Sequence, residues 1–506
     1  MKEKIRKTEK EFLAYVSKMT AYNEAISLMY WDLRTGAPKQ GVEQRSEVIG
    51  VLSSEVFKMS TSEEMAAYIA ILRNDEAKAN ISDITQATLE YCKEEYDRNK
   101  KIPEDKYKEY VILQSKAESI WEEAKEKSDF DMFRPYLEKL VEMNKLFINY
   151  WGYKGNKYNT LLDMYEPGMT VDILDQVFGE LRSKIVPLVQ TISESKNKPE
   201  TNFLFEKFPK EQQKGFSLKI LAQMGYNFEA GRLDETVHPF AIGLNPGDVR
   251  VTTKYNEQDF RSAVFGTIHE GGHALYEQNI SKELVGTPLC TGTSMGIHES
   301  QSLFYENFVG RNYSFWKKNY DLLKSYGGDQ FADVAMEDFY RAINESKPSL
   351  IRIEADELTY SLHIIIRYEI EKGLFNDEVE VKDLPEVWNK KYEEYLGVKP
   401  ENDGSGVLQD VHWAGGSFGY FPSYALGYMY AAQFKNAMLK ELPNFNELLA
   451  GGNLQPIRAW LTKNVHQYGK MKKPLEILEK ATGEGLNAKY LVDYLYEKYG
   501  KVYHLN

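Results

Sequence analysis

The pentapeptide His269–His273, with the sequence His-Glu-Gly-Gly-His, contains the residue types of a zinc peptidase centre. On a helix, two histidines four residues apart project from the same face, so His269 and His273 can hold one Zn²⁺ between them. Glu270 then lies beside the ion, where it can act as a general base. The pentapeptide therefore predicts metal-dependent hydrolysis.

The two glycines of this motif are unusual inside a helix, where each costs about 1 kcal/mol relative to alanine. Such a cost is expected where a ligand or another backbone comes close to the helix. The alternative interpretations are a structural zinc site and a helix with two hydrogen-bonded histidines. A structural zinc usually takes four protein ligands, often cysteines, and Cys290 is the only cysteine nearby in the sequence. We therefore favour a catalytic site.

A catalytic zinc needs a third protein ligand, and the segment 296–302, Gly-Ile-His-Glu-Ser-Gln-Ser, offers Glu299. Glu299 opens a second helical pattern, which continues through Leu303, Phe304, Asn307 and Phe308. A helix that supplies the third ligand shortly after the histidine helix is the gluzincin arrangement. The sequence therefore predicts that His269, His273 and Glu299 bind the metal.

The elements that must position these residues are predicted to be mainly helical. In the first 150 residues the apolar residues recur at three- and four-residue steps. This pattern breaks at 36–38, restarts with a capping box at Thr61 and Glu64, and restarts again at Pro103. Strand signals are scarce, and the clearest is the alternating segment Asp248–Tyr255. We therefore expect a mainly α-helical protein with one small β-sheet.

Two irregular segments interrupt the helical pattern. Residues 193–202 are polar and contain Pro199, which predicts a linker or a large loop. Residues 403–419 are rich in glycine, and long loops of this kind inside compact proteins are often functional. The alternative for this second segment is an ordinary flexible connector.

The composition is that of a globular protein with a large core: the chain has 506 residues, of which 42% are hydrophobic and 27% are charged. The net charge of −13 argues against nucleic acid or an anionic membrane as the main partner, because both need a basic surface. The charged N-terminus lacks the apolar core of a signal peptide, no apolar run approaches the length of a membrane span, and cysteines are few. These features predict a cytoplasmic protein.

Several motifs together resemble one family, the thermostable, Taq-type zinc metallocarboxypeptidases. Besides the zinc motif, the matching segments are His238–Phe240 (His-Pro-Phe), Asp248–Thr252 (Asp-x-Arg-x-Thr), His298–Gln301 (His-Glu-Ser-Gln), Ile351–Asp356 (Ile-Arg-x-x-Ala-Asp) and Gly406–Trp413 (Gly-x-x-Gln-Asp-x-His-Trp). They occur in the family's order across nearly the whole chain. The resemblance implies a single domain, residues 1–506, with a fold similar to neurolysin and angiotensin-converting enzyme. In that fold two helical lobes flank a deep groove with the zinc at its floor.

The resemblance also implies an activity, the removal of C-terminal residues from peptides with a free carboxylate and with broad residue preference. It implies one Zn²⁺ per chain, for which Co²⁺ can substitute, and a homodimer. One rival interpretation is a zinc oligoendopeptidase on the same scaffold. Another is a non-catalytic helical binding protein with a structural metal; Glu270 argues against it, because a structural site has no use for a base.

Two arginines are candidates for binding the terminal carboxylate of the substrate. In zinc peptidases an edge strand beside the metal helix can pair with the substrate backbone, and Arg250 on the predicted strand then points into the groove. Its alternative is a salt bridge, for example to Asp248. Arg352 falls on a helical stripe with Asp356 and His363, and its planar fork suits a carboxylate. We predict Arg352 as the anchor, with Asp356 orienting it; an internal pair of these two residues is the alternative.

The segment His412–Gly416 followed by Tyr424 is similar in spacing to the oxyanion-binding segment of the neurolysin-type enzymes. Hydrolysis of an amide builds negative charge on the carbonyl oxygen, and a donor aimed at that oxygen contributes several kcal/mol. The resemblance therefore implies His412 and Tyr424 as catalytic donors and Tyr420 as a weaker, substrate-binding candidate. The alternative for each tyrosine is a packed aromatic ring.

Overall fold

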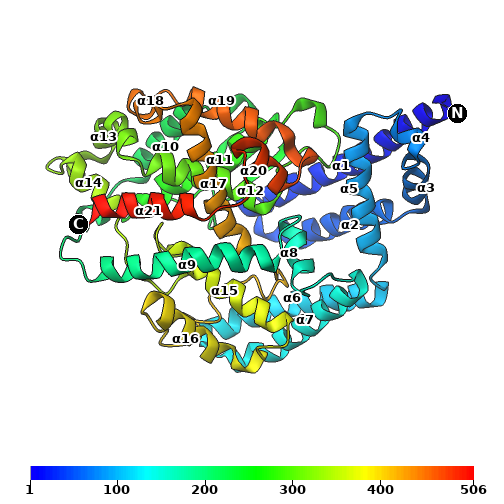
Figure 1. Ribbon diagram of the computed structural model, residues 1–506, viewed down its shortest axis with the longest axis horizontal. Coiled ribbons are helices and arrows are strands. Elements are labelled where there is room, and N and C mark those ends of the chain that lie inside the picture. Colours follow the sequence, from blue (N-terminus) through cyan, green and yellow to red (C-terminus); the bar gives the residue numbers. More distant parts are fainter. Residues whose placement is uncertain (1, 506) are drawn as a thin grey trace.

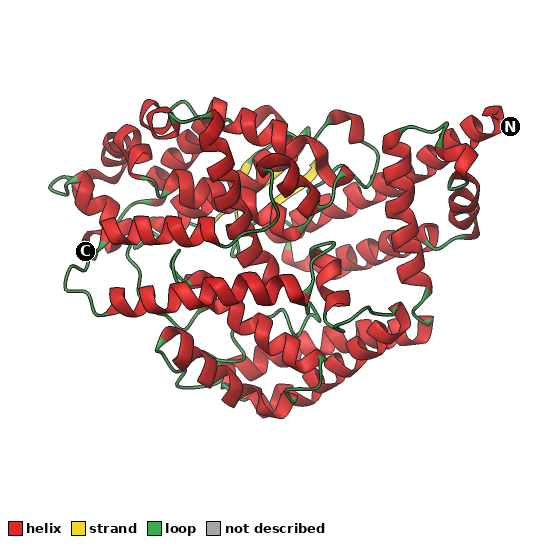
Figure 2. Cartoon of the chain, viewed as in Figure 1, coloured by secondary structure: helices red, strands yellow, loops and turns green. Residues whose placement is uncertain are grey.

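The computed structural model describes residues 2–505, and Figure 2 shows that helices make up most of the molecule. The N-terminal helices are α1 (Lys2–Thr35), α2 (Val42–Ser60), α3 (Glu63–Leu72), α4 (Asp75–Lys78), α5 (Asp83–Lys100), α6 (Glu104–Lys127), α7 (Phe130–Trp151), α8 (Asn159–Tyr165) and α9 (Val171–Ser193). The middle of the chain contains α10 (Lys210–Met224), β1 (Leu233–Glu235), β2 (Ala241–Asn245), β3 (Asp248–Thr253), α11 (Arg261–Gln278), α12 (Met295–Leu303), α13 (Tyr313–Gly327) and α14 (Met336–Ile343). The last helices are α15 (Tyr360–Phe375), α16 (Leu384–Leu396), α17 (Pro422–Glu441), α18 (Phe445–Gly451), α19 (Gln455–Asn464), α20 (Pro474–Thr482) and α21 (Lys489–Val502).

The prediction of a mainly helical chain with a small sheet is confirmed, but one predicted helix start is wrong. Ser62, and not Thr61, caps α3: its hydroxyl accepts a hydrogen bond of 3.0 Å from the backbone N–H of Met65. The Thr61 hydroxyl instead donates to the carbonyl of Phe57 at 2.9 Å. It thereby provides a hydrogen bond to one carbonyl of the last turn of α2, where carbonyl groups lack partners within the helix.

The helices are arranged around one large hydrophobic core, with a smaller core at the N-terminal end. In Figure 1, α7, α9, α15 and α16 lie along the lower side, and α10, α13, α17 and α18 lie along the upper side. The smaller core forms separately, mainly from apolar residues of α1, α3 and α5, including Ile5, Phe12, Val16, Met65, Leu72 and Leu89. The division of the molecule into two helical subdomains stays a prediction.

The sheet has the order β1-β3-β2, so the strand that carries Arg250 is central. β3 pairs in parallel with β1 and antiparallel with β2, and Val251 lies opposite both Leu233 and Ala241. The strand predicted at Asp248–Tyr255 is observed as β3, Asp248–Thr253, but its interpretation as an edge strand beside the metal helix is wrong. β1 and β2 are the two edge strands, and β2 packs together with β3 against α11.

Close packing through glycines holds three helices of the core together. A Cβ on Gly272 of α11 would lie 2.5 Å from the backbone oxygen of Gln301 in α12. A Cβ on Gly427 of α17 would lie 2.7 Å from the Cβ of Glu299, on α12 as well. These glycines allow α12 to lie between α11 and α17 at distances that alanine does not permit.

The two irregular segments lie outside the helices. Most of the segment predicted as a linker, residues 193–202, forms a loop after α9. In the segment 403–419, the Trp413 indole and the Gly419 amide donate to Glu371 at 2.7 and 2.8 Å. This segment is therefore anchored in the core, in contrast to a flexible connector. None of the helices within residues 2–505 combines the length and the apolar character that a membrane crossing requires.

Candidate metal centre and active site

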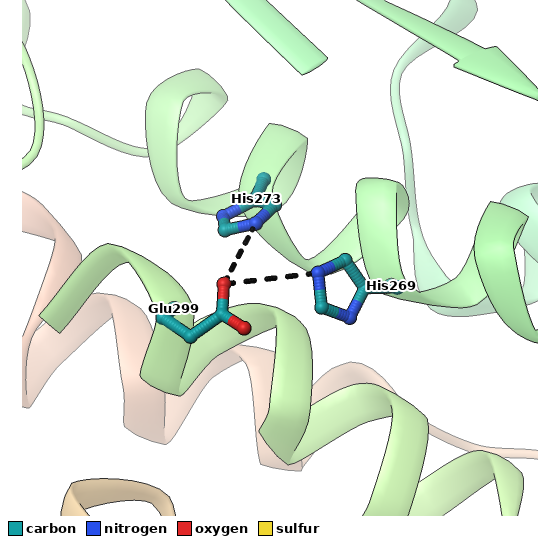
Figure 3. Close-up of side chains that lie close together, drawn as sticks. All are labelled: His269, His273 and Glu299. Carbon is teal, nitrogen blue, oxygen red and sulfur yellow. Dashed lines mark ion pairs between the residues drawn. The ribbon is translucent and has the colours of Figure 1, made fainter. Parts of the chain in front are cut away.

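α11 and α12 bring the three predicted metal ligands together, as Figure 3 shows. The Nε2 atoms of His269 and His273 lie 3.7 and 3.4 Å from Oε2 of Glu299. Two donor atoms bound to one tetrahedral zinc ion lie roughly 3.4 Å apart. The separation and the chemistry of this donor set therefore fit a zinc ion held by two imidazoles and one carboxylate.

The other ring nitrogens of both histidines are hydrogen-bonded, which leaves the Nε2 atoms free for a metal. His269 Nδ1 lies 2.9 Å from Glu306, whose carboxylate also accepts a hydrogen bond of 3.0 Å from Arg311. Glu306 belongs to a π-helical segment, residues 304–310, that continues α12. Such partners fix the orientation of a ligating imidazole and raise its basicity.

His273 is held by a longer chain of contacts. Its Nδ1 lies 2.6 Å from His298 Nδ1, and His298 Nε2 lies 2.9 Å from Glu277. Sequence reasoning missed both Glu277 and Glu306 as supports of the site. Glu277 had a detectable signal, because it lies one helical turn after His273 on the same face of α11.

Burial and the neighbouring carboxylates shift the pKa values at the centre in different directions. Burial lowers the pKa of His273 to about 4, so this imidazole is neutral, as a metal ligand must be. Burial also opposes the charged form of His269, but Glu299 and Glu306 overcome it and raise the pKa of His269 to about 10.

Glu270 is 8% exposed and faces the groove beside the three ligands. Burial raises the pKa of Glu270 to about 7, although the neighbouring His269 lowers it. A carboxylate with such a pKa can both take up and release a proton near neutral pH, which is what a general base and acid must do.

The three ligands and Glu270 line a groove of about 1010 Å³, at the upper end of the usual size of a ligand site. Residues 241–243 of the edge strand β2 line it together with α11 and α12. Arg352, Tyr420 and Tyr424 also line it. The structure therefore brings most of the predicted site residues to one groove.

Arg352 lies in a 3₁₀ turn, Arg352–Glu354, and α15 begins only at Tyr360. The predicted helical stripe of Arg352, Asp356 and His363 is therefore wrong. Asp356 instead accepts hydrogen bonds from the backbone N–H groups of Leu358 and Thr359 at 2.9 and 3.1 Å. These bonds hold the chain in a turn at the point where the stripe required a helix.

The partner of Arg352 is Asp410, which the sequence did not indicate. Its Nε and Nη2 donate to one oxygen of Asp410 at 3.0 and 2.9 Å, and Arg367 Nε donates to the other oxygen at 2.7 Å. Two buried guanidinium groups thus share one carboxylate. Burial alone would raise the pKa of Asp410, but Arg367 and Arg352 outweigh it and hold this pKa well below its usual range. The cluster carries one excess positive charge at the wall of the groove.

Arg250 does not line the groove. Its guanidinium forms two hydrogen bonds with Asp248, at 2.8 and 2.7 Å, and lies over the ring of Trp31 at 5.6 Å. It faces a separate cavity of about 590 Å³ beside α1. The prediction that Arg250 points into the groove is therefore wrong, and its pair with Asp248 is the arrangement observed.

His412 is not among the residues that line the groove, but its Nε2 atom lies 3.2 Å from the hydroxyl of Tyr424, which does line it. The Nδ1 atom of His412 is buried and has no hydrogen-bond partner among the described residues. Burial lowers the pKa of His412 to about 4, so the ring is neutral. Tyr424 also packs against Tyr420 at 5.3 Å and lies 5.0 Å from the guanidinium of Arg352.

Comparisons with known proteins agree with this geometry. The sequence profile of the family described as "Carboxypeptidase Taq (M32) metallopeptidase" matches residues 11–499. Carboxypeptidase 1 of Bacillus subtilis is 60% identical over 495 residues, which cover 98% of both chains. Thermostable carboxypeptidase 1 of Thermus thermophilus is 40% identical over 498 residues, or 96% of this chain and 97% of that one.

Solved structures show the same similarity in three dimensions. The crystal structure of an M32 carboxypeptidase from Deinococcus radiodurans R1 has a TM-score of 0.95 at 33% sequence identity, and the match covers 99% of this chain and 100% of the other. The family profile spans nearly the whole chain, and the two carboxypeptidases from Bacillus subtilis and Thermus thermophilus share more than a third of its residues. These matches leave one assignment. The chain belongs to the Taq-type (M32) family of metallocarboxypeptidases.

Proposed function

We propose that this protein is a zinc-dependent carboxypeptidase that hydrolyses the C-terminal peptide bond of peptides with broad residue preference. The observation that carries the proposal is the convergence of His269, His273 and Glu299 beside Glu270 in one groove. One Zn²⁺ per chain, replaceable by Co²⁺, would be held by the two imidazoles and the carboxylate. When bound, such an ion polarises the carbonyl to be attacked and makes water more acidic.

Glu270 supplies the proton transfers of the reaction. As the general base it takes a proton from the attacking water, and as the general acid it passes this proton to the leaving amine. Burial, which raises the pKa of Glu270, favours the uptake of a proton by this carboxylate. Its carboxylate has no hydrogen-bond partner within residues 2–505, so it is available to water and substrate.

Arg352 is the residue that we assign to the free carboxylate of the substrate. It is 6% exposed and belongs to a cluster with one excess positive charge, so an incoming carboxylate would neutralise the cluster. A buried charge without a partner is costly, and pairing it favours binding. Arg250 supports this choice indirectly, because its charge is already paired with Asp248.

Tyr424 and His412 are proposed to stabilise the negative charge that develops on the carbonyl oxygen. The Tyr424 hydroxyl is the donor that faces the groove, and His412 orients it through the contact of 3.2 Å. Tyr420 would bind substrate through its ring, next to Tyr424. The edge strand β2 would align the substrate as an additional strand, since residues 241–243 face the groove.

The remaining parts of the proposal rest on the resemblance and on composition. They are a single domain over residues 1–506 with two helical subdomains, a homodimer, a cytoplasmic location, and peptides in place of nucleic acid or membrane as partners. The net charge of −13 supports the last of these. Light scattering coupled to size-exclusion chromatography tests the homodimer.

The decisive experiment offers one peptide in two forms, with a free C-terminus and with a C-terminal amide, and follows the products by mass spectrometry. A carboxypeptidase shortens the free acid one residue at a time and leaves the amide intact. Internal cleavage of both forms would identify an oligoendopeptidase. Absence of cleavage by the zinc-loaded protein would indicate a binding protein with a structural metal. A Glu270→Gln variant controls for contaminating peptidases.

A further inference from the structure

Glu166 is a buried carboxylate that has no role in the proposed reaction. It directly follows α8, whose label lies below that of α12 in Figure 1, and it is 2% exposed. Its Oε2 atom accepts a hydrogen bond of 2.9 Å from the backbone N–H of Gly296, in the first turn of α12. Its Oε1 atom accepts one of 2.9 Å from the hydroxyl of Tyr430, on α17. A single side chain therefore joins the end of α8 to both α12 and α17.

The close approach of Glu166 to α12 depends on a glycine. A Cβ on Gly296 would lie 2.6 Å from Oε2 of Glu166 and 3.1 Å from the ring of Tyr430, so a larger residue would displace one of them. Tyr430 follows Gly427 by three residues on α17, and a Cβ on Gly427 would lie 2.7 Å from the Cβ of Glu299. The part of α17 that Glu166 holds is therefore the part that packs against the metal ligand.

The hydrogen bond to Gly296 adds to the capping of α12. The first N–H groups of a helix have no partner within the helix. The hydroxyl of Ser294 accepts from the backbone N–H of Ile297 at 3.0 Å, and Glu166 takes the N–H of Gly296. A carboxylate is also favoured at this end, because the N-terminus of a helix carries a partial positive charge. Two side chains from distant parts of the chain therefore hold the first turn of α12.

The start of α12 carries two residues of the metal centre. Glu299, the third predicted ligand, follows Gly296 by three residues, which is nearly one helical turn. His298 lies between them in the sequence, and its Nδ1 atom lies 2.6 Å from Nδ1 of His273. A shift of the first turn would therefore move both the carboxylate ligand and the support of one imidazole ligand.

A buried carboxylate at this position is unfavourable for the stability of the fold. Glu166 forms no ion pair within residues 2–505, and its hydrogen bonds come from a backbone amide and a hydroxyl, which are neutral. Burying a charge is costly unless it is paired with an opposite charge. Residues that lower stability are expected where function requires them. Stability alone therefore does not account for Glu166.

We propose that Glu166 is a positioning residue for the metal centre. Its two hydrogen bonds hold the first turn of α12 against α17, so that Glu299 keeps its place beside His269 and His273. The ends of helices fray when their unpaired N–H groups lack partners, and loss of Glu166 would free this turn to move. The inference rests on the proposed function, because it takes these three residues as the zinc ligands. Glu166 itself contacts neither the zinc ligands nor the groove.

The affinity of the full-length protein for Zn²⁺, measured by competition with a chelator, tests the proposal. We expect Glu166→Ala to bind zinc about tenfold more weakly, the lower end of the range for loss of a group that orients a metal ligand. Glu166→Gln should stay within about threefold of the wild type, because its amide can accept from Gly296 and donate to the Tyr430 hydroxyl. Wild-type affinity in Glu166→Ala, or an equal loss in Glu166→Gln, would overturn the inference.

Glu371→Ala is the matched control. Glu371 is also a fully buried carboxylate, but it accepts hydrogen bonds from the Trp413 indole and the Gly419 amide and so anchors the segment 403–419. We expect Glu371→Ala to lower Tm and to bind zinc as the wild type does. Equal losses of zinc affinity in the two alanine variants would trace the effect to general destabilisation and would overturn the inference.

Two further variants cover the case in which Glu166→Ala does not fold. Glu166→Asp keeps the carboxylate but is one methylene shorter, so it cannot reach both Gly296 and Tyr430. Gly296→Ala places a Cβ 2.6 Å from the carboxylate and displaces it. Both should weaken zinc binding by several-fold, and wild-type affinity in both would overturn the inference alone. Absence of zinc binding by the wild type would overturn the proposed function as well.

Discussion

Replacing Arg352 with alanine should remove the excess positive charge that the groove offers to the terminal carboxylate of a substrate. In the wild type, Arg352 and Arg367 share Asp410, and Arg352 is only 6% exposed. In the variant, Arg367 and Asp410 balance each other and no unpaired charge remains. Loss of one partner of a buried charge pair costs about 2–4 kcal/mol, which corresponds to a decrease in kcat/KM of about 30- to 800-fold.

The assay measures kcat/KM for a peptide with a free C-terminus, and the same peptide with a C-terminal amide, which the wild type should leave intact, serves as the control substrate. The loss in Arg352→Ala should appear as a lower kcat/KM for the free acid, while the amide stays uncleaved. Arg352→Lys keeps the charge but loses the planar fork, and we expect an intermediate loss of about tenfold. Arg250→Ala is the matched control, because Arg250 faces a different cavity and is paired with Asp248.

Two results would refute this reasoning. If Arg352→Ala cleaves the free acid as well as the wild type does, the excess charge of the cluster does not bind the carboxylate. If Arg250→Ala loses the preference for the free acid while Arg352→Ala keeps it, the anchor lies on β3, and the groove must change shape when substrate binds. Thermal unfolding of both variants separates either result from a general loss of stability.

Four further predictions concern the metal centre. Glu270→Gln removes the base and should lower kcat at least about 100-fold with unchanged metal content, as kinetics beside metal analysis will measure. His273→Ala leaves two ligands and should lose the metal, yet keep the circular dichroism of the wild type because the core is large. Gly272→Ala should lower Tm more than Gly271→Ala. The new Cβ at position 272 would lie 2.5 Å from a backbone oxygen, whereas the one at position 271 would lie 2.7 Å or more from the ends of side chains, which can move aside. Glu306→Gln should weaken metal affinity by about 10- to 100-fold in competition with a chelator.

Each of these predictions has an outcome that contradicts it. Full activity of Glu270→Gln, after deamidation has been excluded, would leave the base unidentified. Unfolding of His273→Ala would indicate a structural metal, and equal Tm values for the two glycine variants would show that α12 can move away from α11. Unchanged metal affinity in Glu306→Gln would show that the contact with His269 does not support the ligand.

The parts of the site that the sequence predicted depend on short-range geometry. The spacing of His269 and His273 fixes their common face on any helix, and Glu299 follows on the next helix. Residues 279–294 separate the two helices, so the prediction that Glu299 meets the two histidines rested on the gluzincin pattern of ligands and not on local geometry. The mainly helical fold was predictable because helical periodicity is a local property.

The parts that the sequence could not predict depend on pairing between distant residues. Asp410 follows Arg352 by 58 positions, and no local pattern relates them. The partner strands of β3 have only three and five residues, too few for a recognisable alternation, so the sequence does not reveal that β3 is the central strand. The helix predicted through Arg352 and Asp356 does not form, because backbone hydrogen bonds to the Asp356 side chain hold a turn at this point.

The glycine contacts on both sides of α12 have a consequence for the motions of the molecule. Because Gly272 and Gly427 bring α12 into close contact with both neighbours, we expect α11, α12 and α17 to move together as one body. A hinge that opens the groove for a peptide is then expected outside these three helices. The distances among the three metal donors would then stay constant while the groove opens and closes, and the ion would require no reorganisation of its ligands in any catalytic cycle.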